Sequence, residues 1–363
     1  MKIAHITTVH KANDNRIFYK ECVTLANQGY DVTLIAAGAT TAKLDRVTIV
    51  GYPRSQGRFK RIVKTSFVDL IKVCKNVQAD IYHFHDPELM LAGVYLKIIG
   101  KKVIYDIHEN NPASILSKPY IKSQLLKKSI SKIFDLFEKT TVRFFDALVT
   151  ARPDITKRFQ HSNIITLRNF PILANFEGLK QLKIEKKKPT VIFVGGMTKI
   201  RGIYELIDAF EELDEYELWL LGPITEKELE LKIQNGCKNV KYLGIVDATE
   251  VFSYIQQADI GIITFLPVPN HINTLATKPF EYMACGKPMI MSDFKYWRET
   301  FAESSLYVDP SDAKAIASTV EKLLKDNKLM RKMGELNKKL SIQEYNWEQE
   351  SQKLLQLYRK LND

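Results

Sequence analysis

Short apolar runs alternate with amphipathic stretches along the whole chain. In the first half, the runs that predict strands lie at residues 2–8, 31–37, 79–84, 101–107, 146–150 and 163–167. A second series begins after Pro189 and lies at 190–194, 217–221, 240–243, 259–264, 288–291 and 306–308. The stretches between them, such as 15–28, have the apolar spacing of helices. Strands and helices that alternate in this way form parallel sheets covered on both faces, so the pattern predicts an α/β protein.

The segment 169–188 separates the two series. It contains Pro171 and Gly178, ends against Pro189 and includes the charged run 185–188. Such a composition is typical of a linker. We therefore expect two Rossmann-like, doubly wound domains, an N-terminal one at 1–170 and a C-terminal one at 171–345, followed by a last helix at 346–363.

Length and composition fit this division. A chain of 363 residues is long for one hydrophobic core. No apolar run reaches the roughly 18–20 residues of a membrane span, and the N-terminal apolar stretch is too short for a signal peptide. Four widely spaced cysteines fit no metal spacing and are expected as free thiols of a cytoplasmic protein. They are Cys22, Cys74, Cys237 and Cys285.

The net charge of +11 is uneven along the chain. Residues 1–170 hold 27 Lys and Arg against 14 Asp and Glu, whereas residues 171–363 hold 26 against 28. A basic first half implies an acidic partner: nucleic acid, anionic lipid or a phosphorylated acceptor. Two stretches that mix basic and bulky apolar residues, 58–64 and 118–145, favour an anionic membrane surface, although core helices with a basic solvent face have the same pattern. No nucleic-acid-binding motif is present, so we do not expect nucleic acid as a partner.

The most informative motif is Thr-Lys-Pro-Phe-Glu-Tyr-Met-Ala-Cys-Gly-Lys-Pro-Met-Ile at residues 277–290. It predicts a short helix that carries Glu281 and ends at Gly286, with a buried strand directly after it. An ordinary amphipathic helix with a glycine cap gives the same pattern. The motif also resembles the donor-site signature of family-4 retaining glycosyltransferases of the GT-B fold, in which this glutamate binds the ribose of a nucleotide-sugar.

The resemblance implies two Rossmann-like domains that face a central cleft, with the last helix crossing back onto the first domain. A second match is the loop Gly195–Gly202, which follows a strand and opens a helix. Glycines allow the backbone to approach phosphate closely, and Arg201 supplies a cation. The family has arginine where this chain has Gly196, and usually lysine where it has Arg201, so one diphosphate-binding cation is missing.

Further donor contacts are implied by position. The family's glutamate that contacts the transferred sugar is replaced by Asn273, which can hydrogen-bond but carries no charge. In the loop 270–277 the backbone amides, up to Thr277, are candidates for phosphate contacts. Lys278 is the candidate for the missing cation, with a solvated lysine as the alternative. The backbone near Ile245 is placed to contact the base.

The first half offers candidates at strand ends, where ligands of doubly wound domains bind. His108 resembles the family's histidine that hydrogen-bonds the donor sugar, and His85 and Asp86 are expected to face the acceptor. His83 and His85 share a strand face and, with Asp86 and Glu88, also suggest a metal site, which we consider the weaker interpretation. On the acceptor side, Asp14 and Arg16 replace the family's usual glycine pair; Arg16 is a candidate for contacting phosphate, and a solvated arginine is the alternative.

Together these residues predict a retaining transferase that moves a sugar from a nucleotide diphosphate sugar, UDP- or GDP-linked, to a glycan or lipid-linked acceptor in cell-surface polysaccharide synthesis. The catalytic group is expected to comprise His108, Arg201, Lys278 and Glu281. No cofactor and no metal ion is expected, and the enzyme is expected at the inner face of the membrane. Two alternatives stay open. One is a GT-B nucleotide-sugar epimerase, with Asp86, Asp106 and Glu109 as candidate acid and base groups. The other is a non-catalytic nucleotide-sugar-binding relative.

Overall fold

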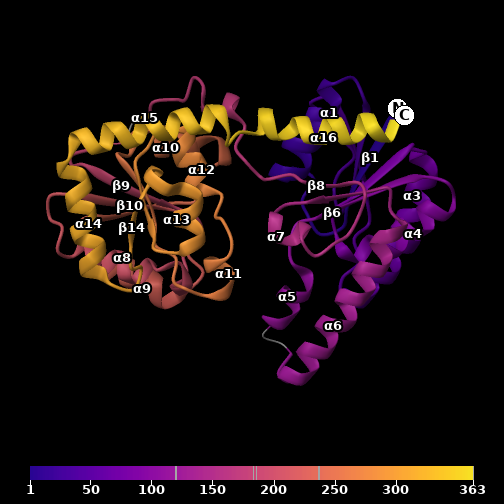
Figure 1. Ribbon diagram of the computed structural model, residues 1–363, viewed down its shortest axis with the longest axis horizontal. Helices are drawn as coiled ribbons and strands as arrows, with labels where there is room; N and C mark the ends of the chain where they lie inside the picture. The colour runs from indigo at the N-terminus through magenta and orange to yellow at the C-terminus, as the bar shows by residue number, and fades with distance from the viewer. Residues whose placement is uncertain (119–120, 183, 185, 236–237, 363) are drawn as a thin grey trace. The chain divides into compact units, whose positions relative to one another are not determined.

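The computed structural model describes residues 1–118, 121–182, 184, 186–235 and 238–362. Glu185, Cys237 and residues 119–120 of the basic stretch 118–145 therefore lie outside the described residues, and the side chain of Arg58 is likewise not described. The chain divides into two compact units (Figure 1). The first comprises Met1–Asn169 and the C-terminal stretch from Glu348, and the second comprises Phe170–Trp347.

Within the described residues, the first unit holds an eight-stranded sheet of order β3-β4-β2-β1-β5-β6-β7-β8. All its neighbouring strands are parallel except β3 and β4. The six predicted strands of this half are confirmed, whereas β3 and β4 were not predicted. The strands are β1 (Lys2–Thr7), β2 (Asp31–Ala37), β3 (Ala42–Leu44), β4 (Val47–Tyr52), β5 (Ile81–Phe84), β6 (Lys102–Ile107), β7 (Ala147–Thr150) and β8 (Ile164–Thr166).

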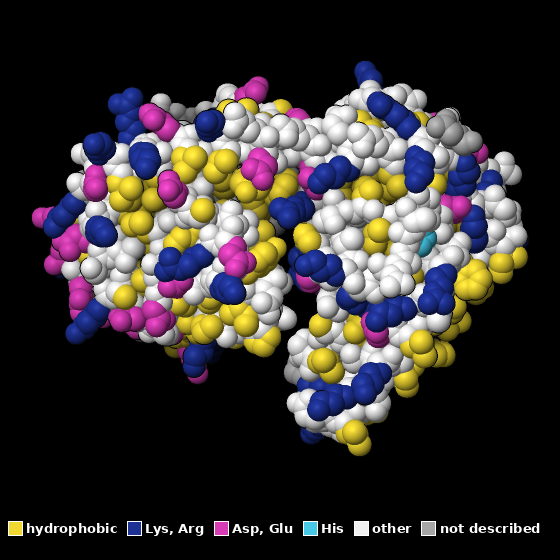
Figure 2. Space-filling model, viewed as in Figure 1, with side chains coloured by type: hydrophobic (Ala, Val, Ile, Leu, Met, Phe, Trp, Pro, Cys, Tyr) yellow, Lys and Arg dark blue, Asp and Glu magenta, His cyan; other side chains and the backbone are white. Residues whose placement is uncertain are grey.

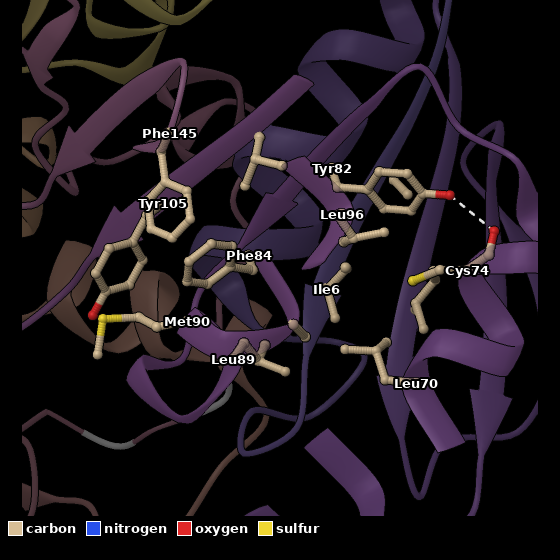
Figure 3. Close-up of a cluster of buried hydrophobic side chains, with 14 of the residues drawn as sticks. Ile6, Leu70, Cys74, Tyr82, Phe84, Leu89, Met90, Leu96, Tyr105 and Phe145 are labelled. Atoms are coloured by element: carbon tan, nitrogen blue, oxygen red, sulfur yellow. Dashed lines mark hydrogen bonds between the residues drawn. The ribbon is translucent and has the colours of Figure 1, made fainter. Parts of the chain in front are cut away.

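One face of this sheet packs on a large apolar core. Ile6, Tyr82, Phe84 and Tyr105 point to it from neighbouring strands, and the rings of Phe84 and Tyr105 stack at 4.6 Å (Figure 3). Helices α3 and α4 cover that face. The helices of the unit are η1 (Asn15–Cys22), α1 (Val23–Asn27), α2 (Arg58–Lys60), η2 (Arg61–Asp69), α3 (Leu70–Val77), η3 (Pro87–Leu89), α4 (Met90–Ile98), α5 (Asn111–Leu116), α6 (Gln124–Thr141), η4 (Val142–Phe144) and α7 (Pro153–Thr156).

The helix predicted at 15–28 is present in two parts. Its first part, η1, is π-helical, and the α-helical α1 continues from it. Asp14 begins the element, because its carboxylate accepts hydrogen bonds from the backbone amides of Arg16 and Ile17, at 2.9 Å each.

In the second unit, the described residues form a six-stranded parallel sheet of order β11-β10-β9-β12-β13-β14. Successive residues of one strand face different cores, with Phe193 in one apolar cluster and Ile192 in another, so both faces of the sheet are covered. All six strands predicted here are confirmed: β9 (Thr190–Val194), β10 (Glu217–Leu221), β11 (Val240–Gly244), β12 (Ile260–Ile263), β13 (Met289–Ser292) and β14 (Leu306–Val308).

Helices connect these strands and lead back to the first unit. They are η5 (Leu173–Phe176), η6 (Lys199–Arg201), α8 (Ile203–Phe210), α9 (Lys227–Asn235), α10 (Ala248–Gln257), α11 (Pro269–Ile272), α12 (Lys278–Ala284), α13 (Lys295–Phe301), η7 (Ala302–Ser304), α14 (Ala313–Lys325), α15 (Asn327–Gln343) and α16 (Trp347–Asn362). From Glu348 on, α16 belongs to the first unit, where Leu354 and Tyr358 are fully buried. In the part of the chain that the structure describes, no helix is long and apolar enough to cross a membrane.

Candidate functional site

Two loops of the second unit meet where β9 and β12 end. The two strands are parallel neighbours, so the loops that follow them emerge at the same edge of the sheet. The backbone amide of Leu266 donates to the carbonyl of Ile200 at 2.9 Å. A Cβ on Gly202, which has φ +68°, would lie 1.8 Å from the carbonyl oxygen of Thr264. Glycine is therefore required at this position for the two loops to touch.

Arg201 lies over the glycine pair that ends β9. Its Nη1 donates to the carbonyl of Gly196 at 2.9 Å, and its guanidinium lies 5.4 Å from the ring centre of Phe265. A Cβ on Gly195 would approach Nη1 to 2.9 Å, so this glycine makes room for the guanidinium. Burial lowers the pKa of Arg201. Among the described residues, no carboxylate pairs with it. The guanidinium thus occupies the region where the missing arginine at Gly196 would begin.

Helix α12 begins at the same edge with an exposed Thr277 as its N-cap residue, whose side chain makes no capping hydrogen bond. Lys278 Nζ lies 2.6 Å from Glu281 Oε2, so these two predicted ligand-binding groups hold each other. Asn273 follows α11 and is exposed, and Ile245 follows β11 with 73% of its surface exposed. The second unit therefore carries its predicted donor-binding residues on the loops that follow its strands and on the short helices η6 and α12.

Arg16 does not reach solvent, and the expectation that it contacts phosphate or acceptor is wrong. Its side chain is buried, with Nε and Nη2 donating to the carboxylate of Asp106 at 3.0 and 3.1 Å, and Nη1 donating to the carbonyl of Leu167 at 2.7 Å. Burial alone would raise the pKa of Asp106, but Arg16 and His108 outweigh it and hold that pKa well below its usual range. The sequence cannot show this pairing, because Asp106 lies 90 residues further along the chain.

His108 lies at the end of β6 beside the same carboxylate. Its Nε2 is 3.1 Å from Asp106 Oδ2 and 3.2 Å from His85 Nδ1. Because an ionised carboxylate only accepts hydrogen bonds, Asp106 favours the tautomer of His108 with the proton on Nε2. This leaves Nδ1 of the partly exposed His108 as an acceptor.

The other predicted acceptor-side residues have structural partners. Asp86 is buried, and its Oδ2 accepts from the hydroxyl of Thr7 at 2.9 Å and from the amides of Thr8 and Val9 at 2.6 and 3.2 Å. Asp14 caps η1. His85 is buried, and burial lowers its pKa to about 4, so it is neutral at physiological pH. These side chains bond to the loops at the edge of the sheet and hold them in place, and they do not extend freely into solvent.

A cavity of about 540 Å³ opens beside these loops within the first unit. His10, Arg61, His108, Glu109 and Lys118 contribute polar groups to its lining, and Ile62, Ile115 and Phe134 contribute apolar surface. Arg61 pairs with Glu88, which also lines the cavity, through Nε at 2.9 Å. Sequence reasoning assigned Arg61 to a basic surface stretch and missed this pair, because the two residues are 27 positions apart.

Comparisons with known proteins agree with this architecture. The family model described as "Glycosyltransferase Family 4" matches residues 15–166, and that described as "Glycosyl transferases group 1" matches residues 176–340. The lipopolysaccharide core biosynthesis glycosyltransferase LpsE of Rhizobium meliloti is 25% identical over 225 residues, which are 58% of this chain and 64% of that protein. The alpha-maltose-1-phosphate synthase of Mycobacterium tuberculosis is 24% identical over 344 residues, 84% of this chain and 85% of that protein.

Solved structures share the fold. The sucrose-phosphate synthase of Thermosynechococcus elongatus superposes with a TM-score of 0.77 at 18% identity, covering 99% of this chain and 98% of that one. Anabaena HepE, solved in complex with UDP and glucose, superposes with a TM-score of 0.69 at 13% identity, covering 99% of each chain. The two parallel-sheet units and the two matching family models lead to one conclusion: the chain belongs to the family-4 glycosyltransferases and has the GT-B fold.

Proposed function

We propose that the chain is a retaining glycosyltransferase that moves a sugar from a UDP- or GDP-linked donor to a glycan or lipid-linked acceptor in cell-surface polysaccharide synthesis. The observation that carries the proposal is the half-buried guanidinium of Arg201 above Gly195 and Gly196, which within the described part of the chain hydrogen-bonds to a backbone carbonyl only. A planar cation next to a backbone without side chains suits the oxygens of a diphosphate.

The other donor contacts follow from position. Glu281 is proposed to accept hydrogen bonds from the ribose, and Lys278 to turn from Glu281 toward the diphosphate. Thr277 and the amides before it are proposed to contact phosphate, and the backbone at Ile245 to contact the base. Asn273 and the free Nδ1 of His108 are proposed to contact the sugar. HepE was solved with UDP, which supports a nucleoside diphosphate donor for this chain.

The acceptor is proposed to bind in the 540 Å³ cavity of the first unit. Its mixture of apolar walls and polar groups suits a sugar ring, which has apolar faces and hydroxyl edges. The same geometry weighs against an epimerase, because Asp86 and Asp106 are buried and already bonded to protein groups. Of the three carboxylates considered for that chemistry, Glu109 alone is exposed. The relative LpsE, named for lipopolysaccharide core biosynthesis, supports a cell-surface glycan as the acceptor class.

We further propose that the first unit binds the cytoplasmic face of an anionic membrane through α6 and its neighbours. Leu125, Ile133 and Leu136 on α6 expose 66–77% of their surface, and Phe59 on α2 exposes 79%. Lysine side chains accompany them, as Figure 2 shows for the lobe formed by α5 and α6. Apolar side chains among cations fit a lipid surface, which accepts both.

Not every basic residue of the two stretches is available for lipid. Lys127 is buried, Lys139 pairs with Asp135 at 2.6 Å, and Arg61 is held by Glu88. On α6 the exposed lysines are Lys128 and Lys132. The proposed surface is therefore smaller than the sequence pattern indicated.

A panel of nucleotides and nucleotide-sugars, each added to the protein before thermal unfolding, tests the donor assignment. A ligand that binds only the folded chain raises the melting temperature. At a concentration of about a hundred times its dissociation constant, it adds about 2.7 kcal/mol to the free energy of unfolding. We expect UDP or GDP, and the sugar conjugate of the same nucleotide, to raise the melting temperature. We also expect the protein to hydrolyse that conjugate slowly when no acceptor is present. No shift with any nucleotide would contradict the proposal.

Co-sedimentation with anionic vesicles tests the membrane proposal separately. Each lysine at such a surface contributes about 1 kcal/mol at modest salt, so Lys128→Glu with Lys132→Glu should release most of the protein. The matched control reverses Lys295 and Lys325, exposed lysines of the second unit, and should sediment like the wild type. If wild-type protein does not sediment with anionic vesicles at low salt, the membrane proposal is ruled out and the donor assignment is unaffected.

A further inference from the structure

Three histidines and a glutamate converge on the covered face of the first sheet, opposite the apolar core of Figure 3. His5 lies on β1 and is the register partner of His83 on β5, and His85 follows β5 on the same face. Glu21 comes from η1. All four side chains are buried, with between 0 and 2% of each residue's surface exposed. One ligating atom from each lies within 4.8 Å of the others.

The separations are close to those of a metal site. His5 Nδ1 is 3.0 Å from His85 Nε2 and 3.8 Å from Glu21 Oε2. Two ligands of a tetrahedral Zn²⁺, each about 2.0–2.1 Å from the ion, lie about 3.3 Å apart. The separations within the cluster extend to 4.8 Å, so binding an ion would draw the four groups together by up to about 1.5 Å.

Buried polar atoms in the cluster lack partners. Among the described residues, Glu21 Oε2 and His83 Nε2 make no hydrogen bond although both are shielded from solvent. The carboxyl of Glu21 also lies beside two charged groups, with Oε1 3.0 Å from Arg16 Nε and the side chain of Asp106 within hydrogen-bonding reach. A buried polar group without a partner costs about 1–3 kcal/mol, so an interior of this kind favours a ligand that uses the atoms.

The nitrogens on the far sides of the rings already have partners of the kind that orient metal ligands. His5 Nε2 is 3.3 Å and His83 Nδ1 is 2.9 Å from the hydroxyl of Tyr358 on α16. His85 Nδ1 is 3.3 Å from Asp106 Oδ2. Metal-bound histidines commonly donate their second N–H to a carboxylate or another oxygen, which fixes the ring and its tautomer.

We propose that His5, Glu21, His83 and His85 bind one Zn²⁺ ion, which has a structural role. Three imidazoles and a carboxylate are a ligand set that zinc takes, and four protein ligands in a closed site leave no position for substrate. The ion ties β1, β5 and η1 together behind the edge that carries His108. Its route inward passes His85, which also lines the 540 Å³ cavity.

The sequence interpretation considered His83 and His85 with Asp86 and Glu88, and it disfavoured metal because the strand is buried, the two carboxylates lie past it and transfer in the GT-B fold needs no divalent ion. The structure turns those two carboxylates to other partners, Asp86 to the amides of Thr8 and Val9 and Glu88 to Arg61. In their place it brings in His5 and Glu21, which are 16 residues apart in sequence and match no metal motif.

Metal analysis of the whole protein tests the proposal. After chelation and gel filtration, the chain should take up one equivalent of Zn²⁺ or Co²⁺, and bound Co²⁺ should give the intense visible absorption of a tetrahedral site. Zn²⁺ should also raise the melting temperature. The variants Glu21→Gln and His83→Gln should lower Co²⁺ affinity at least tenfold, whereas His161→Gln, a histidine of the same unit outside the cluster, should leave it unchanged.

Circular dichroism of each variant establishes that it is folded, and the wild-type titration decides the question even if both variants unfold. The proposal is overturned if wild-type protein takes up no Co²⁺ and Zn²⁺ does not change its melting temperature. The four side chains would then form a metal-free hydrogen-bonded cluster ending at Tyr358. Equal Co²⁺ affinity in wild type and both folded variants would place the ion elsewhere and overturn it as well.

Discussion

The two sheets present contrasting edges where their parallel strands end. In the first unit the polar side chains at this edge hold one another: Arg16, His85 and His108 contact Asp106, and Asp86 bonds to the loop after β1. In the second unit, glycines, exposed side chains and backbone groups prevail, and among the residues that the structure describes the guanidinium of Arg201 hydrogen-bonds only to a backbone carbonyl.

The difference separates polar residues that shape a site from polar residues that are available to a ligand. A buried charge must have a partner, so the first edge is a fixed network, and His85, Asp86 and His108 are its members that line the cavity. The second edge carries a guanidinium and loop amides that we propose to bind an anion. The following substitutions each change one feature at the edge of one sheet, and their effects test whether the two edges differ in this way.

The largest expected effect is the loss of Asp106. Asp106→Asn removes the carboxylate that accepts from Nε and Nη2 of the buried Arg16 and leaves it, among the described residues, the contact with Glu21. We therefore expect the free energy of unfolding to fall by about 3–5 kcal/mol in urea denaturation. Glu109→Gln changes an exposed carboxylate near the same edge and should stay within about 0.5 kcal/mol of wild type. Similar stability of the two variants would mean that the network is not what holds the first edge.

In the second unit the corresponding structural residue is a glycine. Gly202→Ala places a Cβ against the carbonyl of Thr264 at a left-handed φ, and we expect a loss of at least about 2 kcal/mol in the same assay. Gly178→Ala is the matched control, because Gly178 has φ +59° with no atom within 4 Å of the added Cβ. Its free energy of unfolding should fall by only about 1 kcal/mol, the cost of placing a residue with a Cβ in the left-handed conformation. Equal losses would show that close loop contact is unimportant.

The Arg61–Glu88 pair predicts a pH dependence at the cavity. Burial would raise the pKa of Glu88, but hydrogen bonds from Arg61, Thr8 and Ser66 outweigh it and hold the pKa below its usual value. The carboxylate therefore stabilises the fold above its unfolded pKa of about 4.3, and this contribution is lost as the pH falls through the lower folded value. Arg61→Met should cost about 1–2 kcal/mol at pH 7 and progressively less below pH 4. A cost that does not vary with pH would indicate lost packing alone.

The smallest expected effect concerns Lys278. If this lysine turns from Glu281 to the diphosphate, Lys278→Met should weaken binding of the nucleoside diphosphate about fivefold, or about 1 kcal/mol, and leave the nucleoside unaffected. Isothermal titration with both ligands measures the difference. Gly196→Arg in that background should restore part of the loss, since a Cβ at Gly196 meets its nearest atom at 3.5 Å. Equal weakening for nucleoside and diphosphate would assign Lys278 a structural role.

Sequence patterns predicted the sheets more fully than the site. Strands such as β9 and β13 are buried runs between turn residues, so their periodicity alone identifies them. β3 has only three residues, all exposed, and gives no such run, whereas the six-residue β4 was missed although it is largely apolar. The donor loops were predicted because they are local: Arg201, Thr277 and Glu281 each lie within a few residues of their own motif. The first edge depends on partners that lie far apart in the chain, and neither the burial of Arg16 nor the convergence of His5 with His83 leaves a local pattern.

The central claim is that the second edge is the donor site, and titration of UDP and GDP into the Glu281→Ala variant tests it most directly. Losing hydrogen bonds from ribose to a charged acceptor costs about 1.5–3 kcal/mol, so we predict that the dissociation constant of the preferred nucleotide rises at least about tenfold. Glu299→Ala, an exposed glutamate on α13 of the same unit, should bind as the wild type does. An unchanged dissociation constant in folded Glu281→Ala would contradict the assignment.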